Sequence, residues 1–108
     1  MNWTLLESAE QISGIKQHQG YSVIFKHSTR CSISAMAKNR LDKAISPASI
    51  LFYYLDLLKY RPISNKIADD FHIHHQSPQV LIIKNGECTY EESHNGIDMQ
   101  DIAEQITI

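Results

Sequence analysis

The chain has 108 residues, of which 43% are hydrophobic and 8% aromatic. This is enough for one compact domain with a hydrophobic core and too short for two, so we expect a single domain over residues 1–108. The formal net charge is -2 and the basic residues are scattered, which argues against a nucleic-acid partner.

Two cysteines, Cys31 and Cys88, are too few for a disulfide framework. A small domain without such a framework usually belongs to a reducing compartment. The N-terminus lacks the basic-then-apolar pattern of a signal peptide, and the longest apolar run, 50–58, is interrupted by Asp56. We therefore expect a soluble cytoplasmic protein with no membrane partner.

The first third of the chain predicts a helix between two strands. Residues 3–6 form either a short edge strand or an apolar lead-in. A helix over 8–18 begins with the spacing of a capping box, and Gly20 is expected to close it. The run 21–25 is continuously apolar, as in a strand that is covered on both faces.

A second helix and a second central strand follow. The helix is predicted over 31–45, with Pro47 marking its stop, and the strand over 50–58. Two strands joined by a helix form a right-handed βαβ unit with a parallel sheet.

The last part of the chain predicts a helix, a hairpin and a final helix. The helix begins at Arg61-Pro62, because proline suits a first turn. A strand over 80–83 leads into Asn85-Gly86, which favours a type I′ turn, and its partner is 88–92. Asp98 can cap the last helix. The predicted order is (β)αβαβαββα in an α/β fold.

Cys31 falls where the first central strand gives way to a helix. Backbone N–H groups in a first helical turn favour a negative charge, and the thiolate is the form of cysteine that attacks disulfides. Arg30 and His27 could add positive potential. In the four residues from Cys31 to Ser34, a hydroxyl replaces the second thiol of a Cys-x-x-Cys motif. This pattern predicts a one-thiol redox site, and the alternative is an inert, half-buried cysteine.

The order of elements resembles the thioredoxin fold, whose members place an attacking cysteine at the start of this helix and a cis-proline before the hairpin. Cys31 and Pro78 occupy those two places. Three stretches are similar to the monothiol bacilliredoxin family, the small thioredoxin-like proteins of the bacillithiol system. They are 25–34, 61–68 and 75–86, followed by Ser93-His94, and they span most of the chain.

The resemblance implies a thioredoxin-like domain that performs thiol–disulfide exchange. Cys31 would attack the mixed disulfide between a protein and bacillithiol, free the protein and take the small thiol onto itself. It implies S-thiolated proteins as partners, no tightly bound cofactor, and a low-molecular-weight thiol as co-substrate, with that thiol or a reductase regenerating Cys31. The alternative function is a redox-sensing or interaction module that is thiolated without turnover.

Further site residues follow from the resemblance. Pro78 in cis would turn the backbone beside Ser77 toward the substrate, or it is an ordinary loop proline. Arg61 could meet a carboxylate of the thiol, and His94 lies where small-thiol backbones run in glutaredoxin-like proteins. The alternative, which is the simpler one for both residues, is a solvated side chain. Ser34 could donate to the Cys31 sulfur or be a plain first-turn residue.

The loop before the cysteine contributes one more supporting candidate, Thr29. Two positions depart from the patterns of related proteins. Phe25 stands where many thioredoxins carry a buried carboxylate, so no internal base is expected there. Ser32 follows the cysteine where related bacilliredoxins often have proline, which leaves open whether bacillithiol or another small thiol is the partner.

The remaining sulfur and imidazole groups favour structural roles. Cys88 is expected to be a buried structural thiol on the same face as Tyr90, with a distant resolving role as the alternative. His72, His74 and His75 lack carboxylate or cysteine partners at ligand spacing, so no metal site is expected.

Overall fold

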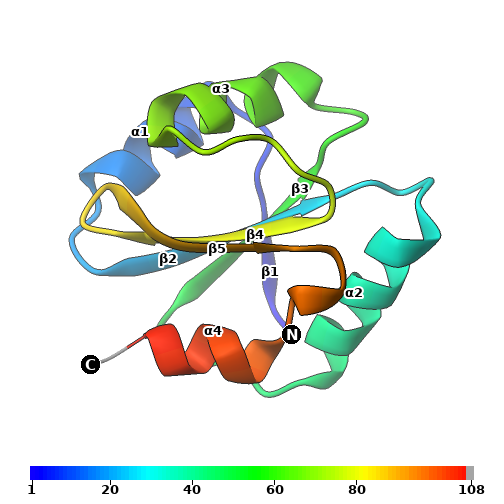
Figure 1. Cartoon of the computed structure of the whole chain (residues 1–108). Coiled ribbons are helices and arrows are strands. Elements are labelled where there is room, and N and C mark those ends of the chain that lie inside the picture. The colour runs from blue at the N-terminus through cyan, green and yellow to red at the C-terminus, as the bar shows by residue number, and fades with distance from the viewer. Residues whose placement is uncertain (107–108) are drawn as a thin grey trace.

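The computed structural model describes residues 1–106 and is built around one mixed five-stranded sheet (Figure 1). In chain order the elements are β1 (Trp3–Leu5), α1 (Ala9–Gln17), β2 (Tyr21–His27), α2 (Ser32–Lys43), β3 (Leu51–Asp56), α3 (Arg61–Phe71), β4 (Gln79–Lys84), β5 (Glu87–Ser93), the 3-10 turn η1 (His94–Gly96) and α4 (Met99–Gln105). The spatial order of the strands is β1-β3-β2-β4-β5. β1, β3 and β2 are parallel, whereas β4 and β5 are antiparallel to their neighbours. The predicted order of elements is confirmed.

Helices cover both faces of the sheet, with α1 and α3 on one side and α2 and α4 on the other (Figure 1). β2 is the central strand, and every residue from Ser22 to His27 is buried. Because strand side chains alternate between faces, Ile24 packs on the α1/α3 side and Phe25 on the α2/α4 side. The continuous apolar run in the sequence is therefore the signature of a strand with two covered faces.

The helix before β2 begins as expected but ends differently. Ser8 is its N-cap and forms the full capping box with Gln11. The helix ends at Gln17, followed by an extended His18, so the expectation that Gly20 closes it is wrong. Gly20, with φ +110°, instead turns the chain into β2, and its N–H donates to Asn85 Oδ1 at 2.7 Å.

β3, the second strand of the βαβ unit, is shorter than the apolar run 50–58 from which it was predicted. β3 ends at Asp56, whose carboxylate accepts hydrogen bonds from the N–H groups of Leu58 and Lys59 and so bends the chain out of the sheet. α2 likewise ends at Lys43, two residues before the predicted boundary. No helix within residues 1–106 is long and apolar enough to cross a membrane.

The hairpin that closes the sheet turns at Asn85-Gly86 as predicted. Both residues have positive φ, +50° and +84°, as a type I′ turn requires. A β-bulge follows, because Ile83 pairs with Cys88 whereas Ile82 pairs with Tyr90, which leaves Thr89 as the extra residue.

The bulge changes which way the next side chains face. Cys88 packs with the core cluster under α1 and α3, whereas Tyr90 packs with the cluster under α2 and α4. The expectation that Cys88 and Tyr90 share a face is therefore wrong, since an inserted residue restarts the alternation of a strand.

Candidate active site

Cys31 is the N-cap residue of α2, four residues beyond the end of β2. Its backbone N–H donates to the Ser28 carbonyl at 3.2 Å, and its own carbonyl accepts the N–H of Ala35 at 3.0 Å. The side chain is half-buried and makes no capping hydrogen bond. The thiol thus lies at the first turn of a helix, at the edge where the parallel strands end, and is not engaged in holding that turn.

Ser34 occupies the place of a second cysteine and is fully buried. Its Oγ lies 3.0 Å from the Ser28 backbone N and 2.7 Å from His27 Nδ1. Because the hydroxyl accepts the Ser28 N–H, its own proton is available to His27 Nδ1. Ser34 therefore bonds the loop before Cys31 to the helix, whereas a bond to the Cys31 sulfur was one of its two predicted roles.

His27 lies under this loop, on the α2/α4 side of the sheet. Its ring stacks on Phe25 at a centroid distance of 5.7 Å and lies 5.6 Å from the Tyr54 ring. Burial, and next the charge of Lys38, lower the pKa of His27 from its usual 6.5. The imidazole is therefore neutral at pH 7 and does not supply the positive potential that we expected of it.

The segment before β4 contains the predicted cis-proline. The Ser77–Pro78 peptide bond is cis, as the resemblance implies. The Pro78 carbonyl accepts the N–H of His94 at 3.1 Å, so these two predicted residues lie side by side. His94 itself is exposed and has a positive φ of 55°.

Arg40, which sequence analysis did not single out, connects α2 to the turn after β5. It lies on α2 and donates from Nη2 and Nε to the Ile97 carbonyl, at 3.0 and 3.2 Å, and from Nη2 to the His94 carbonyl at 3.4 Å. The helix that begins at Cys31 is thereby bonded to the turn that contacts Pro78. A lysine or arginine that serves only backbone carbonyls leaves no pattern in a sequence.

The other predicted residues lie around this edge, and within residues 1–106 no hydrogen bond joins them to one another. Thr29 and Arg30 are exposed on the loop before Cys31, and Arg61 is exposed in the first turn of α3. Ser77 Oγ is buried and has no hydrogen-bond partner in the described chain. The Nδ1 atom of His75, two residues before Ser77, lies 3.5 Å from the hydroxyl of Ser64.

Lys26 is a second residue that sequence analysis missed. It is only 1% exposed, next to His27 in β2. Burial first, and the charge of Arg61 second, lower the pKa of Lys26 from 10.5 to about 8. The signal was available, since strand alternation puts Lys26 on the same face as buried Ile24.

A family model described as "Monothiol bacilliredoxin BrxC" matches residues 4–102. The chain belongs to the monothiol bacilliredoxin family. The match covers every element from β1 into α4, and the three stretches from which the resemblance was drawn all lie inside it.

Solved structures agree on the fold of this bacilliredoxin. A proposed oxidoreductase with a thioredoxin fold is 30% identical, with a TM-score of 0.82 over 93% of this chain and 89% of that one. Thioredoxin from Malassezia sympodialis is 15% identical (TM-score 0.73; 96% and 87% covered), and thioredoxin from Trypanosoma brucei brucei is 16% identical (TM-score 0.76; 95% and 92% covered). Family and fold together identify the bacilliredoxin as a thiol oxidoreductase.

The other thiol of the bacilliredoxin lies at the far end of the sheet. Cys88 is level with Ile83 and Ser22, whereas Cys31 lies beyond His27, so the two differ by more than five residues along β2, roughly 16 Å. A disulfide needs Cα atoms within about 7 Å. Cys88 therefore cannot resolve a disulfide on Cys31 within the folded chain.

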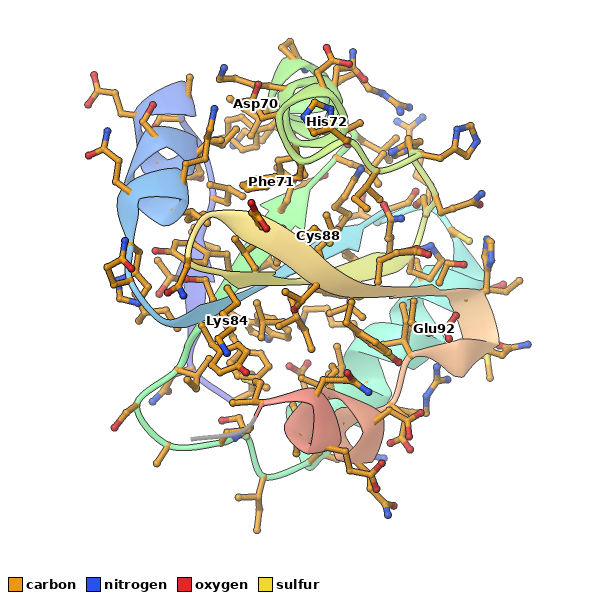
Figure 2. The ribbon with its side chains drawn as sticks, turned by 60° about the vertical axis from the view of Figure 1, so that its left-hand side comes forward. Asp70, Phe71, His72, Lys84, Cys88 and Glu92 are labelled. Carbon is orange, nitrogen blue, oxygen red and sulfur yellow. The ribbon has the colours of Figure 1, made fainter. Side chains whose placement is uncertain are left out.

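Cys88 borders a hollow of about 340 Å³ under the C-terminal end of α3 (Figure 2). Burial raises the pKa of its thiol, which disfavours the reactive thiolate. Within residues 1–106 no three His, Cys, Asp or Glu side chains gather in a way that could hold a metal ion. The hollow is lined by Asp70, Phe71, His72, Gly86, Glu87 and Cys88.

Proposed function

We propose that this bacilliredoxin is a monothiol thiol–disulfide oxidoreductase that reduces mixed disulfides between protein cysteines and a low-molecular-weight thiol such as bacillithiol. The observation that carries the proposal is the single half-buried thiol of Cys31 at the first turn of α2, with a buried serine in the place of a second thiol. A site with one thiol can accept a small thiol but cannot form an internal disulfide with its neighbour.

The proposed exchange takes place in two steps. In the first, the Cys31 thiolate attacks the small-thiol sulfur of the mixed disulfide; that S–S bond breaks, the protein leaves as a thiolate, and a new disulfide joins Cys31 to the small thiol. In the second, a further low-molecular-weight thiol attacks this disulfide, restores the Cys31 thiolate and leaves as a small-molecule disulfide. The incoming thiol is the reductant of the exchange and becomes half of the small-molecule disulfide, and a separate reductase then supplies two electrons that return this disulfide to two thiols.

External regeneration fits the placement of the remaining groups. Ser34 is committed to Ser28 and His27, and Cys88 lies at the other end of β2. We accordingly propose a low-molecular-weight thiol as co-substrate without a tightly bound cofactor, S-thiolated proteins and a thiol reductase as partners, and the cytoplasm as the reducing compartment that such chemistry needs.

The test is release of bacillithiol from a bacillithiolated protein with free bacillithiol as reductant. We expect Cys31→Ser to abolish turnover and Cys88→Ser to retain it. Loss of activity in both variants to the same extent would contradict the assigned roles. If Cys31 takes up one equivalent of bacillithiol and excess thiol does not remove it, the chain is a redox-sensing module and the proposal fails.

A further inference from the structure

Ser34 lies where a second thiol would contact Cys31, but its hydroxyl is bonded elsewhere. Cys31 is the N-cap of α2 and Ser34 is the third residue of that helix, two positions whose side chains can meet across the first turn. Ser34 Oγ instead lies 2.7 Å from His27 Nδ1 and 3.0 Å from the backbone nitrogen of Ser28. Within residues 1–106 both partners of this hydroxyl belong to the strand and loop before Cys31, and the sulfur is not among them.

The direction of these two bonds determines where the hydroxyl proton points. A backbone N–H can only donate, so Ser34 Oγ accepts from Ser28. Ser34 is fully buried, and a buried hydroxyl proton needs an acceptor, which among the described residues is His27 Nδ1. The neutral imidazole then carries its own proton on Nε2 and leaves Nδ1 free to accept.

The hydroxyl of Ser34 thereby has two separable roles. Its bond to Ser28 holds the loop, because the Ser28 carbonyl in turn accepts the Cys31 N–H at 3.2 Å. Its bond to His27 directs the hydroxyl proton. A substitution at His27 therefore changes the direction of the proton and leaves the loop bond in place.

The aromatic surroundings of His27 favour the neutral imidazole that this bond requires. The ring is buried and lies against the rings of Phe25 and Tyr54, at centroid distances of 5.7 and 5.6 Å. Burial is the first cause that lowers the pKa of His27 from 6.5. The phenol of Tyr54, whose own pKa burial raises, is uncharged as well.

The charges that act on this ring from α2 and β3 do not reverse that preference. Lys38 lowers the pKa of His27, whereas Asp56 and Asp42 raise it. Asp42 is bonded to Lys38 Nζ and to Trp3 Nε1, each at 2.7 Å, and Asp56 accepts the N–H groups that end β3. Because both carboxylates have these partners, burial prevails and Nδ1 stays an acceptor at neutral pH.

We propose that His27 is a positioning residue that holds the Ser34 hydroxyl proton away from the Cys31 sulfur. The proposal rests on the proposed function in one respect, the role of Cys31 as the attacking thiolate. A thiolate that accepts a hydrogen bond is stabilised, and a more stable thiolate is a weaker nucleophile. His27 thus keeps the sulfur reactive by acting through Ser34, and it contacts neither disulfide partner.

A pH profile of disulfide exchange tests this role. In a Cys88→Ser background, the single reaction of Cys31 with neutral hydroxyethyl disulfide gives a limiting rate at high pH and a midpoint. We expect His27→Phe, which keeps a ring without an acceptor, to release the hydroxyl to the sulfur. The midpoint should then move down by about one pH unit and the limiting rate should fall about threefold.

Two further variants separate this effect from a structural one. His27→Asn, whose side-chain oxygen can accept the same proton, should restore the native profile. In a Ser34→Ala background, His27→Phe should change neither the midpoint nor the limiting rate, because no hydroxyl remains to be released. An unchanged profile in His27→Phe, or an equal change with and without the Ser34 hydroxyl, would overturn the proposal.

The tautomer of His27 provides a test in the native chain, without any substitution. Nitrogen nuclear magnetic resonance at neutral pH should show the proton on Nε2 and an unprotonated Nδ1. A proton on Nδ1 would make the imidazole the donor to Ser34 and would overturn the proposal. If Cys31 of the native chain does not react with the disulfide, the proposed function is contradicted, and the tautomer still decides the direction of the bond between His27 and Ser34.

Discussion

Two neighbouring residues of β2 carry unusual protonation behaviour, and they point to opposite faces of the sheet. Lys26 lies under α3 without a counter-ion, and His27 lies under α2 with its Nδ1 bonded to Ser34. Burial lowers the pKa of both, so the fold favours the neutral form in each case. The stability of the chain should therefore depend on both groups, each in its own pH window.

Replacement of Lys26 by methionine should stabilise the fold at pH 7. The pKa falls from 10.5 to about 8 on folding, which corresponds to a penalty of about 3 kcal/mol below pH 8 as an upper value. The penalty fades as the pH rises from about 8 to 10.5, where the unfolded chain also loses its proton. Methionine keeps the aliphatic stem, so the urea midpoint of Lys26→Met should rise at pH 7 and approach that of the native chain at pH 10. A lower midpoint at pH 7 would show that the amine has a stabilising partner in the free protein.

Acidification should weaken the fold through His27. Because its folded pKa is depressed, the unfolded chain binds more protons once the pH falls below about 6.5, and stability declines from there toward the folded pKa. Lys38 adds to the depression, whereas Asp56 and Asp42 oppose it. His27→Asn, which keeps an acceptor for Ser34, should show a shallower loss of unfolding free energy between pH 7 and 5.

The measurement for His27 is the urea midpoint at each pH, with one correction. Burial also depresses the pKa of His75, so the pH dependence of the unfolding free energy of the native chain contains contributions from both histidines. The variant His75→Gln measures the contribution of His75. An unchanged slope in His27→Asn would mean that His27 titrates normally in the folded chain.

At the scale of elements, the tip of the hairpin is docked onto the end of the first helix. The Gly20 N–H donates to Asn85 Oδ1 at 2.7 Å, and the Asn85 N–H donates back to the Gly20 carbonyl at 3.0 Å. Gly86 approaches so closely that a Cβ there would collide with the Lys16 carbonyl oxygen. The turn is therefore specified twice, by its positive φ angles and by contact with α1.

Two glycine-to-alanine variants should have opposite effects. Gly86→Ala should destabilise the chain by more than about 1–2 kcal/mol, because the positive φ disfavours a Cβ and the Lys16 carbonyl blocks it. Gly14→Ala, inside α1 with nothing within 4 Å of the added atom, should stabilise it by about 0.5–1 kcal/mol. Chemical denaturation of both at one pH checks the pair, and equal midpoints would refute the close contact.

The order of the elements could be predicted because each leaves a local pattern. The capping box at Ser8, the Asn85-Gly86 turn and the apolar strands are all specified within a few residues. The face of the sheet on which Cys88 packs could not be predicted, because it depends on the β-bulge at Thr89. The alternation of residues within one strand does not reveal a bulge. Gly20 was mistaken for a helix end because its partner, Asn85, is far away in the sequence.

Some features of the site could likewise be predicted from the sequence, and others could not. The position of Cys31 and the cis geometry of Pro78 follow from element order and family resemblance, and both were anticipated. The neutral state of His27 and the engagement of Ser34 depend on burial and on a hydrogen bond across the first turn. Lys26 stood inside a quoted motif, but the predicted strand ended one residue before it, whereas β2 continues to His27 and Lys26 is buried there.

At the scale of the molecule, the sheet separates the two thiols. Cys31 lies at the edge where β2 and β3 end, and Cys88 lies beside the hairpin turn at the opposite edge. Figure 2 shows Cys88 beneath Phe71 and His72, well away from Glu92 near the other end of the same strand. The chain thus has one thiol at the proposed exchange site and one held in a structural position.

Oxidation of the folded chain should therefore be selective. With excess N-acetylcysteine disulfide we expect one adduct, at Cys31, formed at least about tenfold faster than at Cys88, whose thiol is half-buried with a raised pKa. Peptide mass spectrometry at timed intervals gives the two rates, and unfolding in urea should make them equal. An internal Cys31–Cys88 disulfide in the monomer would contradict the separation of the two ends.

Arg40 gives the exchange edge a further property. Its guanidinium bonds the helix that starts at Cys31 to the carbonyls of Ile97 and His94, and the His94 N–H in turn holds Pro78. The helix that begins at the nucleophile and the segment at the cis-proline are therefore connected by a continuous chain of hydrogen bonds. Because these bonds fix α2 relative to the segment at Pro78, we expect the shape and charge of the incoming molecule, not a closing motion of the protein, to decide which disulfides are exchanged.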